Sequence, residues 1–301
     1  MKKFILLIAS LLILGGCAQN TVEREAMTID SNVSKEIPEK TAEASIMQHF
    51  TIESKSLGKS MKVNVYIPQG YTGKEPYSVL YVLHGKNGNE NSFFSNGLDM
   101  NKRADKLIKA GKIKPVLIVS PQIDNSYGVN SSEETKDKKE YNLGMYEDYL
   151  IDELIPIIDN NFNTVKSRGG RYIGGISMGG FAAFHLAFKH QEMFSKVGGH
   201  SAAVWREVPE YLTWLYKNEQ DQSENDPVLL VGNAKVNDMS IYLDHGDKEH
   251  QSIAEGNAAL TEQLDKYRLP YEAHFEASGG HNNKYWASQM DNYLIFYAGI
   301  K

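Results

Sequence analysis

The sequence predicts an α/β fold in which a mostly parallel central sheet of about eight strands carries helices on both faces. Apolar, β-branched and aromatic runs recur along the chain, and segments with helical spacing lie between the later runs. This alternation is typical of parallel sheets. The predicted strands are 49–54, 61–68, 78–84, 115–121, 171–177, 196–202, 240–246 and 271–277. The predicted helices lie near 99–110, 145–160, 178–190, 251–268 and 284–298.

The pattern inside the runs separates central strands from edge strands. Residues 78–84 and 115–121 are almost continuously apolar, as in strands covered on both faces, whereas the first two runs and the last alternate. A hydrophobic content of 41% in 301 residues is adequate for a large core. The formal charge is −6, with no basic block to follow a phosphate backbone, so we expect no nucleic-acid partner.

The first 16 residues have the pattern of an export signal. Lys2 and Lys3 precede an apolar run from Phe4 to Leu14, shorter than the roughly 20 residues that span a bilayer. An uncleaved anchor helix is the alternative that this length disfavours. The LGGC that follows resembles a bacterial lipobox, which implies lipidation of Cys17, the single cysteine. We therefore expect an exported bacterial lipoprotein, anchored by lipid alone at the cell surface or the periplasmic face of a membrane.

The polar stretch that starts at Cys17 predicts a tether. The folded part is predicted to begin where apolar runs start to recur. Residues 17–46 are rich in Glu, Thr, Ser and Lys and show no apolar period. A single folded domain is predicted over 47–301. Within it, 205–239 is longer than a plain connection. We favour a helix packed on the core there, and the alternative is a cap that shapes a pocket.

The stretch GISMG at 175–179 predicts a nucleophilic serine. It follows an apolar strand and precedes a helix rich in small residues, which is the context of a nucleophile elbow. A serine on such a tight turn exposes its hydroxyl above the sheet, and side chains at positions 175 and 179 would collide. Ser177 is therefore the predicted nucleophile.

A serine nucleophile requires a histidine base and a carboxylate that orients it. In the order serine, acid, histidine, His281 has the best context, in a glycine-containing loop after the last strand, with His250 as a distant second. For the acid we favour Glu249, three residues after a glycine, and keep Asp247 and then Asp244 as alternatives. The spacing of these groups matches no metal motif, so no metal site is predicted.

Two backbone N–H groups are predicted to hold the developing oxyanion: that of Met178, at the start of the helix after Ser177, and that of Lys86, in the loop after the third strand. Aromatic side chains are candidates for a substrate pocket, although core packing is the alternative for most of them. They are Trp286, Tyr285, Trp205 and Tyr127.

Six blocks together resemble the esterase family that includes D-type esterases, feruloyl and acetyl xylan esterases, siderophore esterases and mycolyltransferases. They are VNVYIP, LYVLHGKNGNENSF, YEDYLIDELIPIIDNNF, GISMGGFAAFHLAF, YLDHGDKE and GGHNNKYW, and the resemblance covers about 47–300. It implies an α/β-hydrolase fold, a Ser-His-acid triad and no cofactor. This chain departs from the family at Lys86, where an apolar residue is common, and at Glu249, where aspartate is commoner, although mycolyltransferases also use a glutamate.

The sequence thus leads us to expect a serine carboxylic ester hydrolase. Its substrate would be an acetyl, feruloyl or similar short acyl or aryl ester, either a small molecule or linked to a polysaccharide, and hydrolysis would pass through an acyl-enzyme. An acyltransferase on the same scaffold and a non-catalytic surface-binding lipoprotein are the alternatives.

Overall fold

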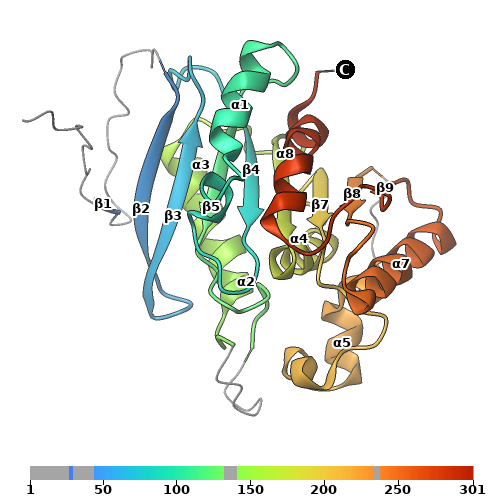
Figure 1. Ribbon diagram of the computed structural model, residues 1–301. Coiled ribbons are helices and arrows are strands. Elements are labelled where there is room, and N and C mark those ends of the chain that lie inside the picture. Colours follow the sequence, from blue (N-terminus) through green and yellow to red (C-terminus); the bar gives the residue numbers. More distant parts are fainter. Residues whose placement is uncertain (1–26, 30–43, 132–140, 233–237, 301) are drawn as a thin grey trace, which may run out of the picture.

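A computed structural model describes residues 27–29, 44–131, 141–232 and 238–300. Its centre is a nine-stranded sheet in the order β1-β2-β3-β5-β4-β6-β7-β8-β9 (Figure 1). The strands are β1 (Met27–Ile29), β2 (Ile46–Ser54), β3 (Lys59–Ile67), β4 (Ser78–Leu83), β5 (Val116–Pro121), β6 (Arg171–Ile176), β7 (Lys196–His200), β8 (Ser240–Asp244) and β9 (Glu272–His274). β3 is antiparallel to both β2 and β5, and the other pairs are parallel. The predicted fold class is confirmed, and the eight predicted strands correspond to β2–β9.

β1 is a strand that the sequence did not predict, and it lies within the predicted tether. It pairs in parallel with β2, Met27 opposite Phe50 and Ile29 opposite Ile52. An edge strand offers unpaired backbone groups to any short extended segment, so three residues suffice for this pairing. The predicted signal at 1–16, Cys17 and most of the tether lie outside the described residues. Within the described part of the chain, no helix is both long and apolar enough to cross a membrane.

Helices cover both faces of the sheet (Figure 1). Two buried clusters divide the strand side chains: in β4, Val79, Tyr81 and Leu83 belong to one, and Leu80 and Val82 to the other. α1 (Met100–Lys109) and α8 (Asn283–Ala298) pack on the second face. The first face carries α2 (Tyr146–Asp148), a π-helical turn (Tyr149–Leu154), α3 (Ile155–Asn161), α4 (Met178–Lys189) and α7 (Gln251–Lys266). Short 3₁₀ turns lie at Ser92–Phe94 (η1) and Arg168–Gly170 (η3).

The described part of the segment 205–239 both packs on the core and reaches a cavity. It contains the 3₁₀ helix η4 (Glu210–Leu215), α5 (Glu219–Asn225) and α6 (Pro227–Leu230). Leu212, Trp214 and Leu215 are buried in the core. Tyr211, on the same turn, is exposed and lines the cavity described below.

The parallel strands determine where functional groups gather. β4, β6 and β8 run in the same direction, so their carboxyl ends meet at one edge of the sheet. Ligand sites of open α/β sheets lie at this edge. The loops that follow these three strands carry Lys86, Ser177 and Glu249.

Candidate active site

Ser177 is held on a strained turn between β6 and α4. Its backbone has φ 56° and ψ −117°, a conformation that residues other than glycine rarely adopt. A side chain at Gly175 would lie 2.2 Å from the carbonyl carbon of Gly179, and one at Gly179 would lie 1.9 Å from the carbonyl oxygen of Leu83. The turn therefore requires glycine at both flanking positions. The Ser177 N–H donates to the carbonyl of His200 at 2.9 Å, which fixes the turn on the neighbouring strand.

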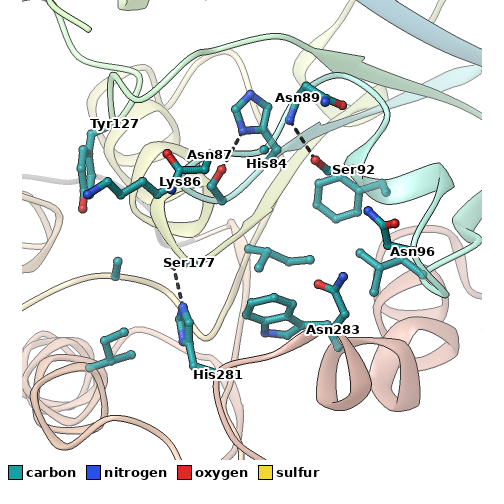
Figure 2. Close-up of a pocket in the computed structure, with 18 of the residues that line it drawn as sticks. His84, Lys86, Asn87, Asn89, Ser92, Asn96, Tyr127, Ser177, His281 and Asn283 are labelled. Carbon is teal, nitrogen blue, oxygen red and sulfur yellow. Dashed lines mark hydrogen bonds between the residues drawn. The ribbon is translucent and has the colours of Figure 1, made fainter. Parts of the chain in front are cut away.

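A chain of hydrogen bonds connects Ser177 to a buried carboxylate. Ser177 Oγ lies 2.8 Å from His281 Nε2 (Figure 2), and His281 Nδ1 lies 2.9 Å from Glu249 Oε1. An ionised carboxylate only accepts, so Nδ1 carries the proton toward Glu249 and Nε2 is left to accept from the serine hydroxyl. The geometry can therefore move a proton from Ser177 onto His281.

The surroundings of Glu249 favour its charged form. Its side chain is only 1% exposed, and this burial raises its pKa. The hydrogen bond and charge of His281, the backbone N–H of His250 at 2.7 Å and the side chain of Ser201 outweigh burial. The pKa of Glu249 is therefore below its ordinary value, and the carboxylate stays ionised to orient His281.

The other candidates for acid and second base have different partners. Asp247 is exposed and accepts from the N–H of Gly279 at 2.8 Å. Asp244 is buried and accepts from Tyr285 and Tyr293, at 2.7 Å each. The ring of His250 packs 5.5 Å from that of His281. The carboxylate on His281 is thus that of Glu249, and the imidazole on Ser177 is that of His281.

The two N–H groups predicted for an oxyanion lie around Ser177. Met178 is the first residue of α4, a position whose N–H has no acceptor within the helix. Lys86 lines the cavity beside Gly85, and a Cβ added at Gly85 would lie 3.5 Å from the Ser177 Cβ. The loop that carries Lys86 therefore approaches the turn that carries Ser177.

His84 supports this loop through two hydrogen bonds. The ring accepts the Ile123 N–H at Nε2 (3.1 Å), so Nδ1 carries the proton and donates to the Gly85 carbonyl at 2.8 Å. The ring is fully buried, and burial lowers its pKa. A neutral imidazole that donates to Gly85 fixes the turn that carries Lys86.

The cavity above Ser177 has a volume of about 1140 Å³ and two chemically different sides. Figure 2 shows Tyr127 and Lys86 on one side of Ser177, and Asn96 and Asn283 on the other. The aromatic side consists of Tyr127, Tyr141, Trp205 and Tyr211. The Lys86 ammonium lies 4.6 Å from the ring centre of Tyr141. The second side presents amides and hydroxyls, from Asn89, Ser92, Asn96 and Asn283.

Three of the four predicted pocket aromatics line the cavity, namely Tyr127, Trp205 and Trp286. The prediction for Tyr285 is wrong: this side chain is 2% exposed, and its hydroxyl donates to Asp244. Asn282 caps α8, and this start of the helix turns Tyr285 toward the end of β8. The sequence analysis missed Tyr141. This residue directly follows a charged stretch that shows no helix or strand pattern. Tyr211 carried one signal, since it shares a short apolar helical face with Trp214.

Comparisons with known proteins show what the chain is similar to. A family model described as "Putative esterase" matches residues 54–297. An endo-1,4-beta-xylanase/feruloyl esterase of Xylanibacter ruminicola is 38% identical over 157 residues, which are 50% of this chain and 21% of that protein. A diacylglycerol acyltransferase/mycolyltransferase of Mycobacterium leprae is 22% identical, covering 81% of each chain.

The structure resembles a solved ferulic acid esterase with a TM-score of 0.71 at 24% identity, covering 85% of this chain and 98% of the other. This likeness shows the α/β-hydrolase fold. The chain spans only about a fifth of the length of the xylanase/feruloyl esterase.

Proposed function

This chain belongs to the "Putative esterase" family, and we propose that it is a serine carboxylic ester hydrolase. The observation that carries the proposal is the continuous hydrogen-bond chain from Ser177 through His281 to Glu249, at the floor of an open cavity. A hydroxyl is a weak nucleophile until a base removes its proton, and this chain supplies the base and its orienting carboxylate.

The proposed reaction has two stages. Ser177 Oγ attacks the ester carbonyl while its proton moves to His281 Nε2, and the N–H groups of Met178 and Lys86 stabilise the oxyanion. The tetrahedral intermediate collapses, and His281 gives its proton to the departing alcohol. A water molecule then attacks the acyl-enzyme, with His281 again accepting a proton. Collapse of this second intermediate returns the proton to Ser177 and releases the carboxylic acid.

The two sides of the cavity support an aryl ester linked to a carbohydrate as substrate. Tyr211, which is 53% exposed, offers flat apolar surface to an aromatic acid such as a feruloyl group, and Tyr127 and Trp205, 4% and 6% exposed, line the same cavity. Asn96 and Asn283 offer neutral donors and acceptors suited to sugar hydroxyls. The similarity to the protein named endo-1,4-beta-xylanase/feruloyl esterase supports the same choice. An acetyl ester is the smaller substrate that the same geometry would accept.

Acyl transfer is the second candidate, because of the similarity to the diacylglycerol acyltransferase/mycolyltransferase. The acyl-enzyme would be the same, and a hydroxyl of an acceptor would replace water. Incubation with an aryl ester and a sugar acceptor, followed by mass spectrometry, distinguishes the two reactions by the ratio of acylated sugar to free acid.

Hydrolysis is tested with the purified protein and Ser177→Ala on p-nitrophenyl acetate, an acetylated sugar, methyl ferulate and a feruloylated oligosaccharide. We expect hydrolysis by the wild type and a loss of at least about a thousandfold in the variant. Circular dichroism checks that the variant is folded. Equal rates for the two proteins on every ester would overturn the proposal.

We also propose export and lipid anchoring, which rest on the pattern of residues 1–17. In a bacterial host, Cys17→Ser should move the protein from the membrane fraction to the soluble fraction and abolish incorporation of labelled fatty acid. Unchanged membrane association and labelling in the variant would contradict lipidation at Cys17.

A further inference from the structure

The two carboxylate oxygens of Glu249 have unequal surroundings. Oε1 is 2.9 Å from His281 Nδ1 and accepts the backbone N–H of His250 at 2.7 Å. Oε2 is buried, and within the described residues no hydrogen bond reaches it. A buried carboxylate oxygen without a donor is costly. The group that faces Oε2 therefore affects how firmly Glu249 is held.

Ser201 belongs to the same cluster of side chains, which runs from Glu249 through His281 and Trp286. It directly follows β7 and is 0% exposed. Its Oγ accepts a hydrogen bond of 3.1 Å from Trp286 Nε1. An indole nitrogen can only donate, so the serine keeps its own proton for another acceptor. The Ser201 side chain is also among the groups that lower the pKa of Glu249, after burial and the contacts of His281 and His250.

The backbone of Ser201 is strained, and a hydrogen bond holds it in this conformation. Its φ is 49°, in the left-handed region that non-glycine residues avoid. Its N–H donates to the carbonyl of Asp244 at 2.7 Å, which holds this conformation against β8. Strain of this kind collects at functional sites.

Trp286 connects the same serine to the base. Its ring packs edge-to-face on His281, with ring centres 5.1 Å apart and planes at 82°. Trp286 is buried, with 9% of its surface exposed. Its indole is held on one side by the hydrogen bond to Ser201 and on the other by the contact with His281. The Ser201 hydroxyl is thus connected to the base through Trp286.

We propose that Ser201 is a positioning residue, whose hydroxyl gives its proton to Glu249 Oε2 while it accepts from Trp286. The inference rests on the proposed function. Ser201 is fully buried, so it acts through Glu249 and Trp286. A glutamate has one more rotatable bond than an aspartate, so a donor at its second oxygen restrains the carboxylate on His281 Nδ1. That restraint keeps the imidazole in the tautomer that accepts the proton of Ser177.

The test removes only the hydroxyl. Ser201→Ala keeps the Cβ and its backbone preference, and Ser120→Ala is the matched control, a fully buried serine in β5 with a hydroxyl that bonds no partner in the described residues. The first measurement is the second-order rate of Ser177 modification by a fluorophosphonate. The second is kcat and KM on p-nitrophenyl acetate from pH 5 to 9. Neither depends on knowing the natural ester.

We expect Ser201→Ala to lower the modification rate and kcat about tenfold, with KM within about twofold of wild type, as for loss of one hydrogen bond to a charged group. The acid limb of kcat/KM should also move to higher pH, because a carboxylate with fewer donors holds a proton more readily. The titratable groups that face Glu249 are His281, His250 and Tyr285, and all remain in the variant. Ser120→Ala should behave as the wild type.

Two double variants separate this role from a general loss of packing. In a Glu249→Gln background, Ser201→Ala should change the rate by less than about twofold, because the carboxylate on which Ser201 acts has already been removed. With Trp286→Phe, the combined loss should be smaller than the product of the single losses. Full additivity in both backgrounds would contradict the inference.

The outcomes distinguish the inference from the function on which it rests. A wild-type protein that the fluorophosphonate does not modify would overturn the proposed function. A modified wild type with Ser201→Ala indistinguishable from Ser120→Ala would overturn the role of Ser201 alone. If Ser201→Ala does not fold, Ser201→Gly carries the same measurements, because glycine accepts the left-handed backbone and also lacks the hydroxyl.

Discussion

The Asp247 carboxylate accepts a hydrogen bond of 2.8 Å from the backbone N–H of Gly279, 32 positions away in the sequence. Two backbone bonds flank this contact, from the Asp247 N–H to the Ala277 carbonyl (2.9 Å) and from the Lys248 N–H to the Gly279 carbonyl (2.7 Å). The turn that carries Glu249 and the loop that carries His281 are thereby held together. Asp247 builds the site, and Glu249 contacts the imidazole.

Exchange of each carboxylate for its amide separates these two roles. Glu249→Gln should lower kcat by about 10³ to 10⁴, because an amide neither stabilises an imidazolium nor fixes its tautomer. Asp247→Asn keeps an oxygen that accepts from Gly279, so kcat should fall by less than about tenfold. Steady-state kinetics on one aryl ester measures both. A larger loss in Asp247→Asn than in Glu249→Gln would assign the acid to Asp247.

Much of the fold followed from local sequence signals. Continuous apolar runs such as 78–84 identified the central strands, because a strand covered on both faces has no room for polar residues. The glycines around Ser177 predicted the turn for a steric reason that the structure repeats at Gly175 and Gly179. Ser177 was predicted from the GISMG turn, His281 from chain order and Glu249 from its spacing after a glycine. The structure brings these three side chains into contact.

Other features depend on tertiary contacts that local patterns do not encode. β1 exists because β2 offers it an edge, and its three residues carry no strand signal of their own. The direction of Tyr285 depends on where α8 begins, which shifts by a residue or two without a clear sequence mark. Ser201 had no signal, because its role arises from Glu249 and Trp286, which lie far along the chain.

The glycine requirement at the turn predicts a loss of stability in Gly179→Ala. The added Cβ would lie 1.9 Å from the Leu83 carbonyl oxygen and 2.7 Å from that of His84, and backbone atoms cannot move aside cheaply. We expect a loss of about 3 kcal/mol in the free energy of unfolding. Gly169→Ala is the control, because its nearest neighbour is the Ser167 hydroxyl at 4.0 Å. Urea unfolding of both variants checks this, and equal midpoints would contradict it.

A buried carboxylate away from the cavity predicts how stability depends on pH. Glu147 accepts hydrogen bonds from His185, His190 and Lys189, at 2.9, 2.8 and 3.0 Å. Burial raises its pKa, but the bonds to the two histidines and the charge of Lys189 outweigh burial and hold the pKa well below its ordinary value. Such a carboxylate stabilises the fold above its unfolded pKa of about 4.3, and this contribution is lost as pH falls toward the folded value.

Glu147→Gln should therefore reduce the free energy of unfolding at pH 7 by about 3 kcal/mol, as expected for removing one partner from a buried charged network. The difference from wild type should shrink as pH falls from 5 to 3. Urea titrations at several pH values measure this difference, and Glu192→Gln is an exposed control on the same side of the network. A difference that stays constant over this range would contradict the role of the Glu147 charge.

The aromatic side of the cavity predicts selectivity between acyl groups. Tyr211 is 53% exposed and lines the cavity, so its removal should leave the core intact. Tyr211→Ala should raise KM for methyl ferulate about fivefold, since one aromatic contact contributes about 1 kcal/mol. KM for p-nitrophenyl acetate should stay unchanged, because its acyl group has no ring. Tyr267→Ala, at an exposed tyrosine after α7, is the control. A rise of KM for p-nitrophenyl acetate alone, whose ring is on the alcohol, would place Tyr211 on the alcohol side and outside the acyl subsite.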